Sequence, residues 1–209
     1  MVETRRRQIE NAASELFRER GYPATSVRDI ARALDIQGAS LYAHVASKEE
    51  MLWSIVDRAA DRFDAEVAPI AEETGIAPHV RLRRMVRAHV RVVTTDQGSA
   101  IVFLDEWRYL SPERRASIAE RRDAYEARFR AVIADGIATG DFHAADPTLA
   151  AAFALSALNG ISAWYRPHGR LTSDQIADAY ADMINAALAH PDSDRKPMPT
   201  HAVTTRIDG

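Results

Sequence analysis

The chain has 209 residues, 46% of them hydrophobic and 27% charged, with a formal net charge of −3 at pH 7. This composition is typical of a folded soluble protein whose core is large enough to need no disulfide or metal ion for stability. The absence of cysteine excludes disulfides, thiolate metal sites and thiol catalysis. The net charge argues neither for nor against nucleic acid. The chain begins with MVETRRRQIE, which lacks the apolar core of a signal peptide, and no stretch approaches the roughly 18 apolar residues that span a membrane. We therefore expect a cytoplasmic protein.

The first fifty residues predict three helices, one long and two short. The first runs from about residue 4 to residue 20 and carries apolar residues at helical spacing until Gly21 ends it. Thr25 or Ser26 then caps a short second helix, and Asp29 lies where a capping acid is expected.

A tight turn at residues 35–37 leads to the third helix, from Ala39 to about His44. The run SKEE at residues 47–50 then opens a long helix that we expect to stop near Pro69.

Beyond residue 70 the helices lengthen, and glycine and proline fall mainly between them. We predict helices at 78–95, 98–110, 112–139, 147–165 and 173–189. No strand pattern and no internal repeat occurs in the sequence. The last residues, 191–209, contain three prolines and few apolar residues, which predicts a disordered tail.

Together these elements predict an all-α protein with an N-terminal three-helix helix-turn-helix head and a C-terminal helical domain for ligand binding and dimerisation. We place the DNA-binding domain at residues 1–50 and the effector-binding and dimerisation domain at residues 51–190. The first fifty residues hold eight basic and eight acidic side chains. A DNA-binding function therefore depends on where charges lie and not on bulk basicity.

The third helix is expected to enter the major groove of DNA. Its small residues allow the backbone to approach the base edges, and the Gln37 amide can both donate and accept a hydrogen bond to a base. Hydroxyl, imidazole and ammonium groups around it suit phosphate contacts. The predicted DNA-binding residues are Thr25, Arg28, Gln37, Gly38, Ala39, Ser40, Tyr42, His44 and Lys48.

The stretch ELFRERGYPATSVRDIARALDIQGASLYAHVASKEEML resembles the head of the tetracycline-repressor (TetR) family of transcription regulators. The likeness lies in the patterns F-x-x-x-G-Y, T-S-V-x-x-I-A and L-Y-x-H, followed by S-K-E. The chain departs from the family at Asp35, Gln37 and Val45, where glycine, a serine or threonine cap, and phenylalanine are common. The resemblance implies a bacterial regulator that binds operator DNA with its head and a small molecule with the rest of the chain.

The segment ALNGISAWYRPHGRLTSDQIADAYADMI and the upstream FLDEWRYLSPERRASIAERRDAYEARF resemble a TetR subgroup that responds to CoA thioesters. We expect Arg166 and Arg170 to pair with CoA phosphates and Trp164 to stack on adenine. The alternative is that both arginines only cap the preceding helix. The predicted ligand-binding residues are Phe103, Trp107, Arg121, Tyr125, Trp164, Arg166 and Arg170.

The last two predicted helices are rich in alanine, which suits a four-helix dimer interface with two helices from each subunit. The sequence thus predicts a homodimeric repressor that binds a palindromic operator and is released by an acyl-CoA-type effector. A response to another apolar small molecule, or action as an activator, remains an alternative.

Other classes of protein have less support. No nucleophile motif, phosphate loop or cofactor fingerprint occurs, and the seven histidines have no ligand spacing, so we expect no enzyme, metal or cofactor. A helical protein that binds another protein and has lost DNA binding is a further alternative, which Tyr42, His44 and Lys48 argue against.

Overall fold

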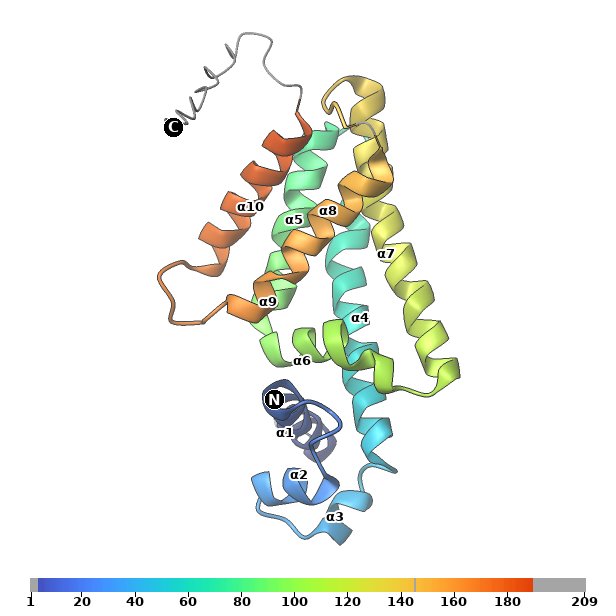
Figure 1. The fold of residues 1–209 in the computed structure, drawn as a ribbon, viewed down its shortest axis with the longest axis vertical. Helices are drawn as coiled ribbons and strands as arrows, with labels where there is room; N and C mark the ends of the chain where they lie inside the picture. The colour runs from blue at the N-terminus through green and yellow to red at the C-terminus, as the bar shows by residue number, and fades with distance from the viewer. Residues whose placement is uncertain (1–3, 145, 190–209) are drawn as a thin grey trace, which may run out of the picture.

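The computed structural model describes residues 4–144 and 146–189, and these residues form helices without any strand (Figure 1). The predicted tail at 191–209 lies outside the described residues. None of the helices in the described part of the chain is long and apolar enough to cross a membrane.

The head consists of α1 (Arg5–Arg20), α2 (Val27–Ala33) and α3 (Gly38–Tyr42). The caps expected from the sequence are present. Gly21 ends α1 with a φ of 81°, and Ser26 and Asp29 form a reciprocal capping box at the start of α2. These local signals set the helix boundaries before any tertiary packing is considered.

The turn between α2 and α3 contains Asp35 with a φ of 52°, within the left-handed region. At this turn position the family that the head resembles commonly has glycine. Aspartate enters this region more readily than most residues with a side chain, because its short carboxyl group interacts with the local backbone. The helix-turn-helix geometry is therefore kept despite the departure.

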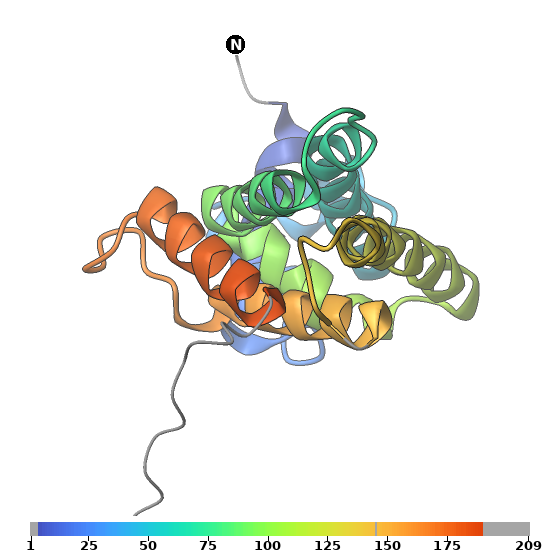
Figure 2. The same ribbon diagram turned by 90° about the horizontal axis from the view of Figure 1, so that it is seen from above.

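The body is built from α4 (Lys48–Ala71), α5 (Pro78–Thr95), α7 (Pro112–Thr139), α8 (Pro147–Asn159) and α10 (Ser173–Leu188). α4 begins in the head and continues into the body, so the predicted division between residues 50 and 51 falls inside one helix (Figure 1). α5 packs against both α4 and α10. Seen from above, α8 and α10 form one face of the body (Figure 2).

Two of the predicted helices are divided in the structure. The segment 98–110 is not one helix but three short pieces, α6 (Gln97–Ile101), the π-helical η1 (Val102–Glu106) and the 3₁₀ turn η2 (Trp107–Tyr109). The helix predicted over 147–165 breaks at Gly160, and its second part is α9 (Ile161–Trp164).

The long helix predicted to stop near Pro69 ends at Ala71, with Pro69 inside its last turn. Near a C-terminus proline removes one backbone hydrogen bond while the remaining turn is held by the bonds around it. The N–H of Glu72 donates to the carbonyl of Ala68, which closes this end.

Gly136 on α7 gives a test of the packing. A Cβ atom at this position would overlap the buried ring of Phe142, whose own backbone N–H donates to the Gly136 carbonyl at 3.0 Å and so fixes the ring. We expect Gly136→Ala to lower the free energy of unfolding by about 1–3 kcal/mol, although alanine is the better helix former.

The melting temperature should fall by about 2–4 °C for each kcal/mol lost in a chain of this length. Gly160→Ala is the matched control, because φ is −60° there and a Cβ atom would make only ordinary contacts, the nearest at 3.4 Å. Calorimetry showing equal melting temperatures for both variants would contradict the packing described for α7.

Candidate functional site

The exposed surface of α3 lies at the end of the molecule away from α10 (Figure 1). Most of the predicted DNA-binding side chains are exposed there, and Tyr42 has 56% of its surface accessible. Arg28, Gln37 and Gly38 line one shallow depression beside the start of α3. Gln37 is the N-cap residue but its side chain makes no capping bond, so the amide is not used by the helix. The other exposed members of the predicted set are Ala39, Ser40 and His44.

Thr25 and Lys48 occupy a different place: Thr25 is buried in the head, and Lys48 is half-buried beside it. Thr25 is only 1% exposed, and its hydroxyl donates to the carbonyl of Gly21 at 2.9 Å. The Lys48 ammonium donates to the carbonyls of Tyr22 and Thr25 at 2.9 and 2.8 Å, and burial lowers its pKa. Both side chains therefore hold the loop before α2 against the start of α4. The Thr25 hydroxyl has no donor left for DNA, whereas Lys48 keeps one N–H.

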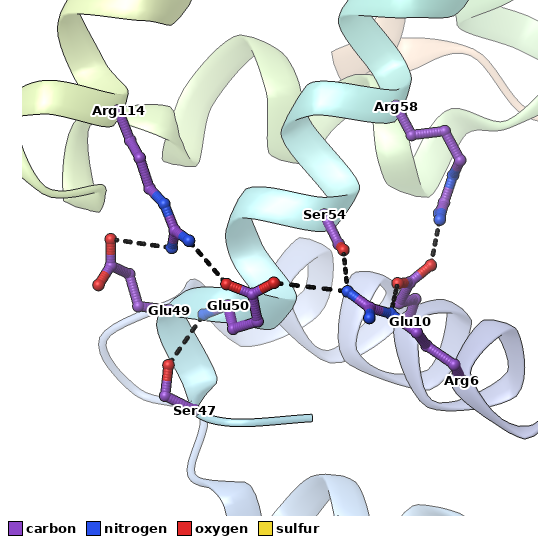
Figure 3. A network of polar contacts seen from close by, with 8 residues as sticks. All are labelled: Arg6, Glu10, Ser47, Glu49, Glu50, Ser54, Arg58 and Arg114. Carbon is purple, nitrogen blue, oxygen red and sulfur yellow. Dashed lines mark hydrogen bonds and ion pairs between the residues drawn. The ribbon is translucent and has the colours of Figure 1, made fainter. Parts of the chain in front are cut away.

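A network of charged side chains joins the head to the body (Figure 3). Glu10 of α1 is almost fully buried and is paired with Arg6 and with Arg58 of α4. Arg6 also reaches Glu50 at 3.4 Å, and Arg114 at the start of α7 binds the other oxygen of Glu50 at 2.6 Å. The start of α4 is thus bound by charge both to α1 and to α7.

A second connection runs from the head to η1 and η2. The backbone N–H of Tyr22 donates to the Glu106 carboxylate at 3.1 Å. The Tyr22 ring stacks on Tyr109 with 5.6 Å between ring centroids, and the Lys48 ammonium lies 4.1 Å from the centre of the same Tyr22 ring. The π-helical segment therefore contacts the loop that positions α2.

A cavity of about 230 Å³ lies between α4, α5, η1, α7 and α8. One side of it is aromatic, with Phe63 at the centre of a cluster. Its ring centroid is 5.3 Å from that of Phe103, 5.7 Å from that of Tyr125 and 4.9 Å from that of His89. An apolar wall with a few polar groups is the usual character of a small-molecule site.

The polar pair in this wall is neutral. His89 is fully buried and its Nδ1 lies 3.0 Å from the Tyr125 hydroxyl. Burial lowers the pKa of His89 to about 3 and raises that of Tyr125. The Nε2 atom of His89 has no hydrogen-bond partner among the described residues.

Two neighbouring arginines on α7 line the cavity in different ways. Arg121 binds Asp57 at 2.9 Å, Asp61 at 2.7 Å and Asp64 at 3.3 Å, all on α4. Arg122 makes no ion pair within the described part of the chain and lies over the rings of Phe103 and Trp107.

The structure brings together only part of the predicted ligand-binding set. Phe103, Arg121 and Tyr125 line the cavity, and Trp107 lies under Arg122 at its edge. The others lie on α9 and the loop after it, outside the cavity lining. Trp164 stacks on Tyr180, and the Arg166 guanidinium donates to the carbonyl of Tyr165 at 2.8 Å. The members outside the cavity lining are Trp164, Arg166 and Arg170.

Sequence analysis missed Phe63 and His89, and it placed Arg121 rather than Arg122 in the ligand-binding set. A signal for His89 was available, because it stands between the apolar residues Ala88 and Val90 in an amphipathic helix. A histidine at such a position is expected to be buried. The difference between the two arginines depends on contacts with α4 and η1. Neither contact is visible in the local pattern.

Comparison with known proteins gives matches along most of the chain. The sequence profile described as "Bacterial regulatory proteins, tetR family" matches residues 9–55, and "Tetracyclin repressor-like, C-terminal domain" matches residues 75–188. The HTH-type transcriptional repressor KstR2 of Rhodococcus jostii (strain RHA1) is 30% identical over 189 residues, which are 90% of this chain and 92% of that protein.

Two solved structures have the same architecture. The ketosteroid transcriptional regulator KstR2 of Mycobacterium tuberculosis has a TM-score of 0.85 at 30% identity, covering 91% of this chain and 98% of that one. AibR in complex with isovaleryl coenzyme A and operator DNA has a TM-score of 0.77 at 32% identity, covering 86% of this chain and 97% of that one.

The buried imidazole of His89 predicts a pH dependence of stability. Its pKa in the folded state is about 3, whereas an unfolded histidine titrates near 6.5. Between these values the unfolded state binds the extra proton, so stability falls as pH drops below 6.5. Between pH 7 and pH 5 this single group should remove about 2 kcal/mol from the free energy of unfolding.

Urea unfolding at both pH values and at one protein concentration measures this loss. His89→Gln carries no titrating group, so it should lose about 2 kcal/mol less than the unchanged protein over the same range. His168→Gln is the control, because His168 lies on the exposed loop after α9. An unchanged slope in His89→Gln would mean that the imidazole is hydrated or protonated in the folded protein.

Proposed function

Since this chain belongs to the TetR family of bacterial regulatory proteins, we propose that it is a homodimeric repressor that binds a palindromic operator and is released by an acyl-CoA-type effector. One observation carries this proposal. The cavity and the head share two elements, because α4 and η1 both line the cavity and both contact the head. A molecule in the cavity therefore acts on the parts that hold the DNA-binding helix.

The head is proposed to bind DNA with α3 in the major groove. Gln37 reads a base edge, the small residues Gly38, Ala39 and Ser40 allow close approach, and Tyr42 contacts phosphate. Two such heads in a dimer lie roughly 34–36 Å apart on successive turns of the duplex. Residues 1–50 serve this role and residues 51–190 bind the effector and the second subunit, and we place this activity in the cytoplasm.

The dimer is proposed to form through α8 and α10. Large apolar side chains on these adjacent helices are exposed in the single chain, with Leu149 at 70%, Phe153 at 52% and Met183 at 57% of their surface. Large exposed apolar side chains on neighbouring helices favour an interaction surface. Alanines between them allow the helices of two subunits to pack closely.

The effector is proposed to be a CoA thioester whose acyl group enters the cavity. AibR was solved with isovaleryl coenzyme A, and its fold and sequence are similar to those of this chain. The cavity of about 230 Å³ is small beside typical ligand pockets, which measure roughly 300–1,000 Å³. That space suits a short or medium acyl group but not the nucleotide. We assign the nucleotide to Trp164, Arg166 and Arg170.

Release of DNA is proposed to follow from a change in the spacing of the two heads. Acyl atoms that enter between Phe63 and Phe103 displace α4 or η1, and the network around Glu10 and Glu50 carries the displacement to α1. The loss of DNA affinity equals the difference in the effector's affinity for the two head spacings.

The experiment that tests the function is fluorescence anisotropy on DNA upstream of the protein's own gene, at fixed salt, with and without a panel of acyl-CoA thioesters. We expect tight binding that one thioester weakens by about 5–150-fold, the usual range of allosteric coupling. Arg170→Ala should keep the DNA affinity and reduce the response to the thioester. DNA binding that no thioester changes would favour another apolar effector. A thioester that increases the affinity for DNA would contradict release of the operator by the effector.

Substitutions in α3 separate base reading from phosphate contact. Gln37→Ala should weaken binding to the operator by about 1–3 kcal/mol and leave binding to unrelated DNA nearly unchanged. Tyr42→Phe removes one hydroxyl and should weaken both by about 0.5–1.5 kcal/mol. Ser117→Ala, on an exposed part of α7, is the control. Equal losses on both DNAs for Gln37→Ala would contradict its role in base reading.

A further inference from the structure

The cavity wall contains one cation without a counter-charge. Arg121 and Arg122 follow each other on α7 and both line the cavity. Arg121 is neutralised by the three aspartates of α4 that bind it. Arg122 has no carboxylate at ion-pair distance anywhere in the described residues. Its one hydrogen bond goes to the backbone carbonyl of Phe103 at 3.5 Å.

The position of Arg122 is fixed by aromatic rings. Its guanidinium carbon lies 5.3 Å from the ring centroid of Phe103 and 5.3 Å from that of Trp107. Such stacking holds the plane of the group but uses few of its five N–H donors. Burial lowers the pKa of Arg122, because the cation has lost water that no anion replaces, although Asp105 and Asp123 act against this from a distance.

The other charged groups of the wall do not replace that missing partner. Asp64 is already bound by Arg121 and Arg128. Asp123 is exposed to solvent and Glu126 is half-buried. His89 stays neutral at physiological pH. Arg122 is therefore the cation of the cavity whose charge is least compensated.

We propose that Arg122 binds an oxyanion of the effector, a phosphate or a carboxylate, at the edge of the cavity. The inference deepens the proposed function, since its ligand is the effector proposed above. A planar guanidinium offers two parallel N–H groups that match the oxygens of either anion. The stacked rings hold this fork in place before the ligand arrives, which reduces the entropy lost on binding.

The position of Arg122 also connects the anion to the head. Its hydrogen bond ends on Phe103 of η1, and Glu106 at the other end of η1 accepts from the Tyr22 N–H of the head. An anion that draws the guanidinium away from the Phe103 carbonyl therefore acts on the segment that contacts the head.

Calorimetry on the full-length protein tests the proposal with three probes: octanoyl-CoA, octanoyl-pantetheine, which carries no phosphate, and octanoate. The unchanged protein should bind at least one of the two anions at least tenfold more tightly than octanoyl-pantetheine. Arg122→Met should reduce that preference, because only the contacts proposed for Arg166 and Arg170 remain, while the affinity of the variant for the neutral thioester stays within about twofold. Arg122→Lys keeps the charge without the fork and should retain part of the preference.

Arg130→Met is the matched control, because Arg130 is an exposed arginine on the same helix. If the preference that depends on Arg122 is for octanoyl-CoA, the group that Arg122 binds is a phosphate. If it is for octanoate, the group is a carboxylate. An equal preference in Arg122→Met and Arg130→Met overturns the proposal, as does an unchanged protein that prefers neither anion.

The operator assay distinguishes failure of this proposal from failure of the proposed function. If octanoyl-CoA releases the Arg122→Met protein from the operator at the same concentration as it releases the unchanged protein, the chain is an acyl-CoA regulator in which Arg122 has no role. Binding of octanoate through Arg122, with no thioester able to release the operator, would keep the anion site and reject the CoA effector.

Discussion

The buried pair of Glu10 and Arg58 is the interaction on which the arrangement of the head depends. Glu10 lies on α1 and Arg58 lies on α4, so one ion pair joins the first helix of the head to the helix that enters the body. Removing Glu10 would leave Arg58 without a carboxylate partner among the described residues, whereas removing Arg58 would leave Glu10 paired with Arg6. α1 therefore has to follow α4, and any rotation of α4 moves the head as a unit.

Two of the places where the body meets that unit begin at the cavity. α4 contributes Phe63 to the cavity wall and Glu50 to the network at its own start. η1 contributes Phe103 to the wall and Glu106 to the Tyr22 N–H. A π-helical turn, with its extra residue, is often found at functional positions in helices. Here this five-residue segment contributes Phe103 and Leu104 to the cavity wall and Glu106 to the contact with the head.

Much of the fold was predictable from sequence because the decisive signals are local. Capping residues, glycine after α1 and proline at the starts of α5, α7 and α8 fixed most helix ends within a residue or two. The breaks at 98–110 and at Gly160 were missed, because they depend on which neighbours each turn contacts. Phe63 and His89 of the cavity wall were missed for the same reason. Phe63, His89 and Tyr125 meet only through the crossing of three helices.

Arg121 and Arg122 show most directly where sequence reasoning reaches its limit. They are identical residues at adjacent positions, and a step of one residue turns the side chain by about 100° around a helix. That step directs Arg121 to the aspartates of α4 and Arg122 to the rings of the segment after α6. Arg121 consequently helps to hold α7 against α4, while Arg122 keeps a charge that no carboxylate among residues 4–144 and 146–189 neutralises. The helix face, and not the residue type, decides which of the two is free to bind a ligand.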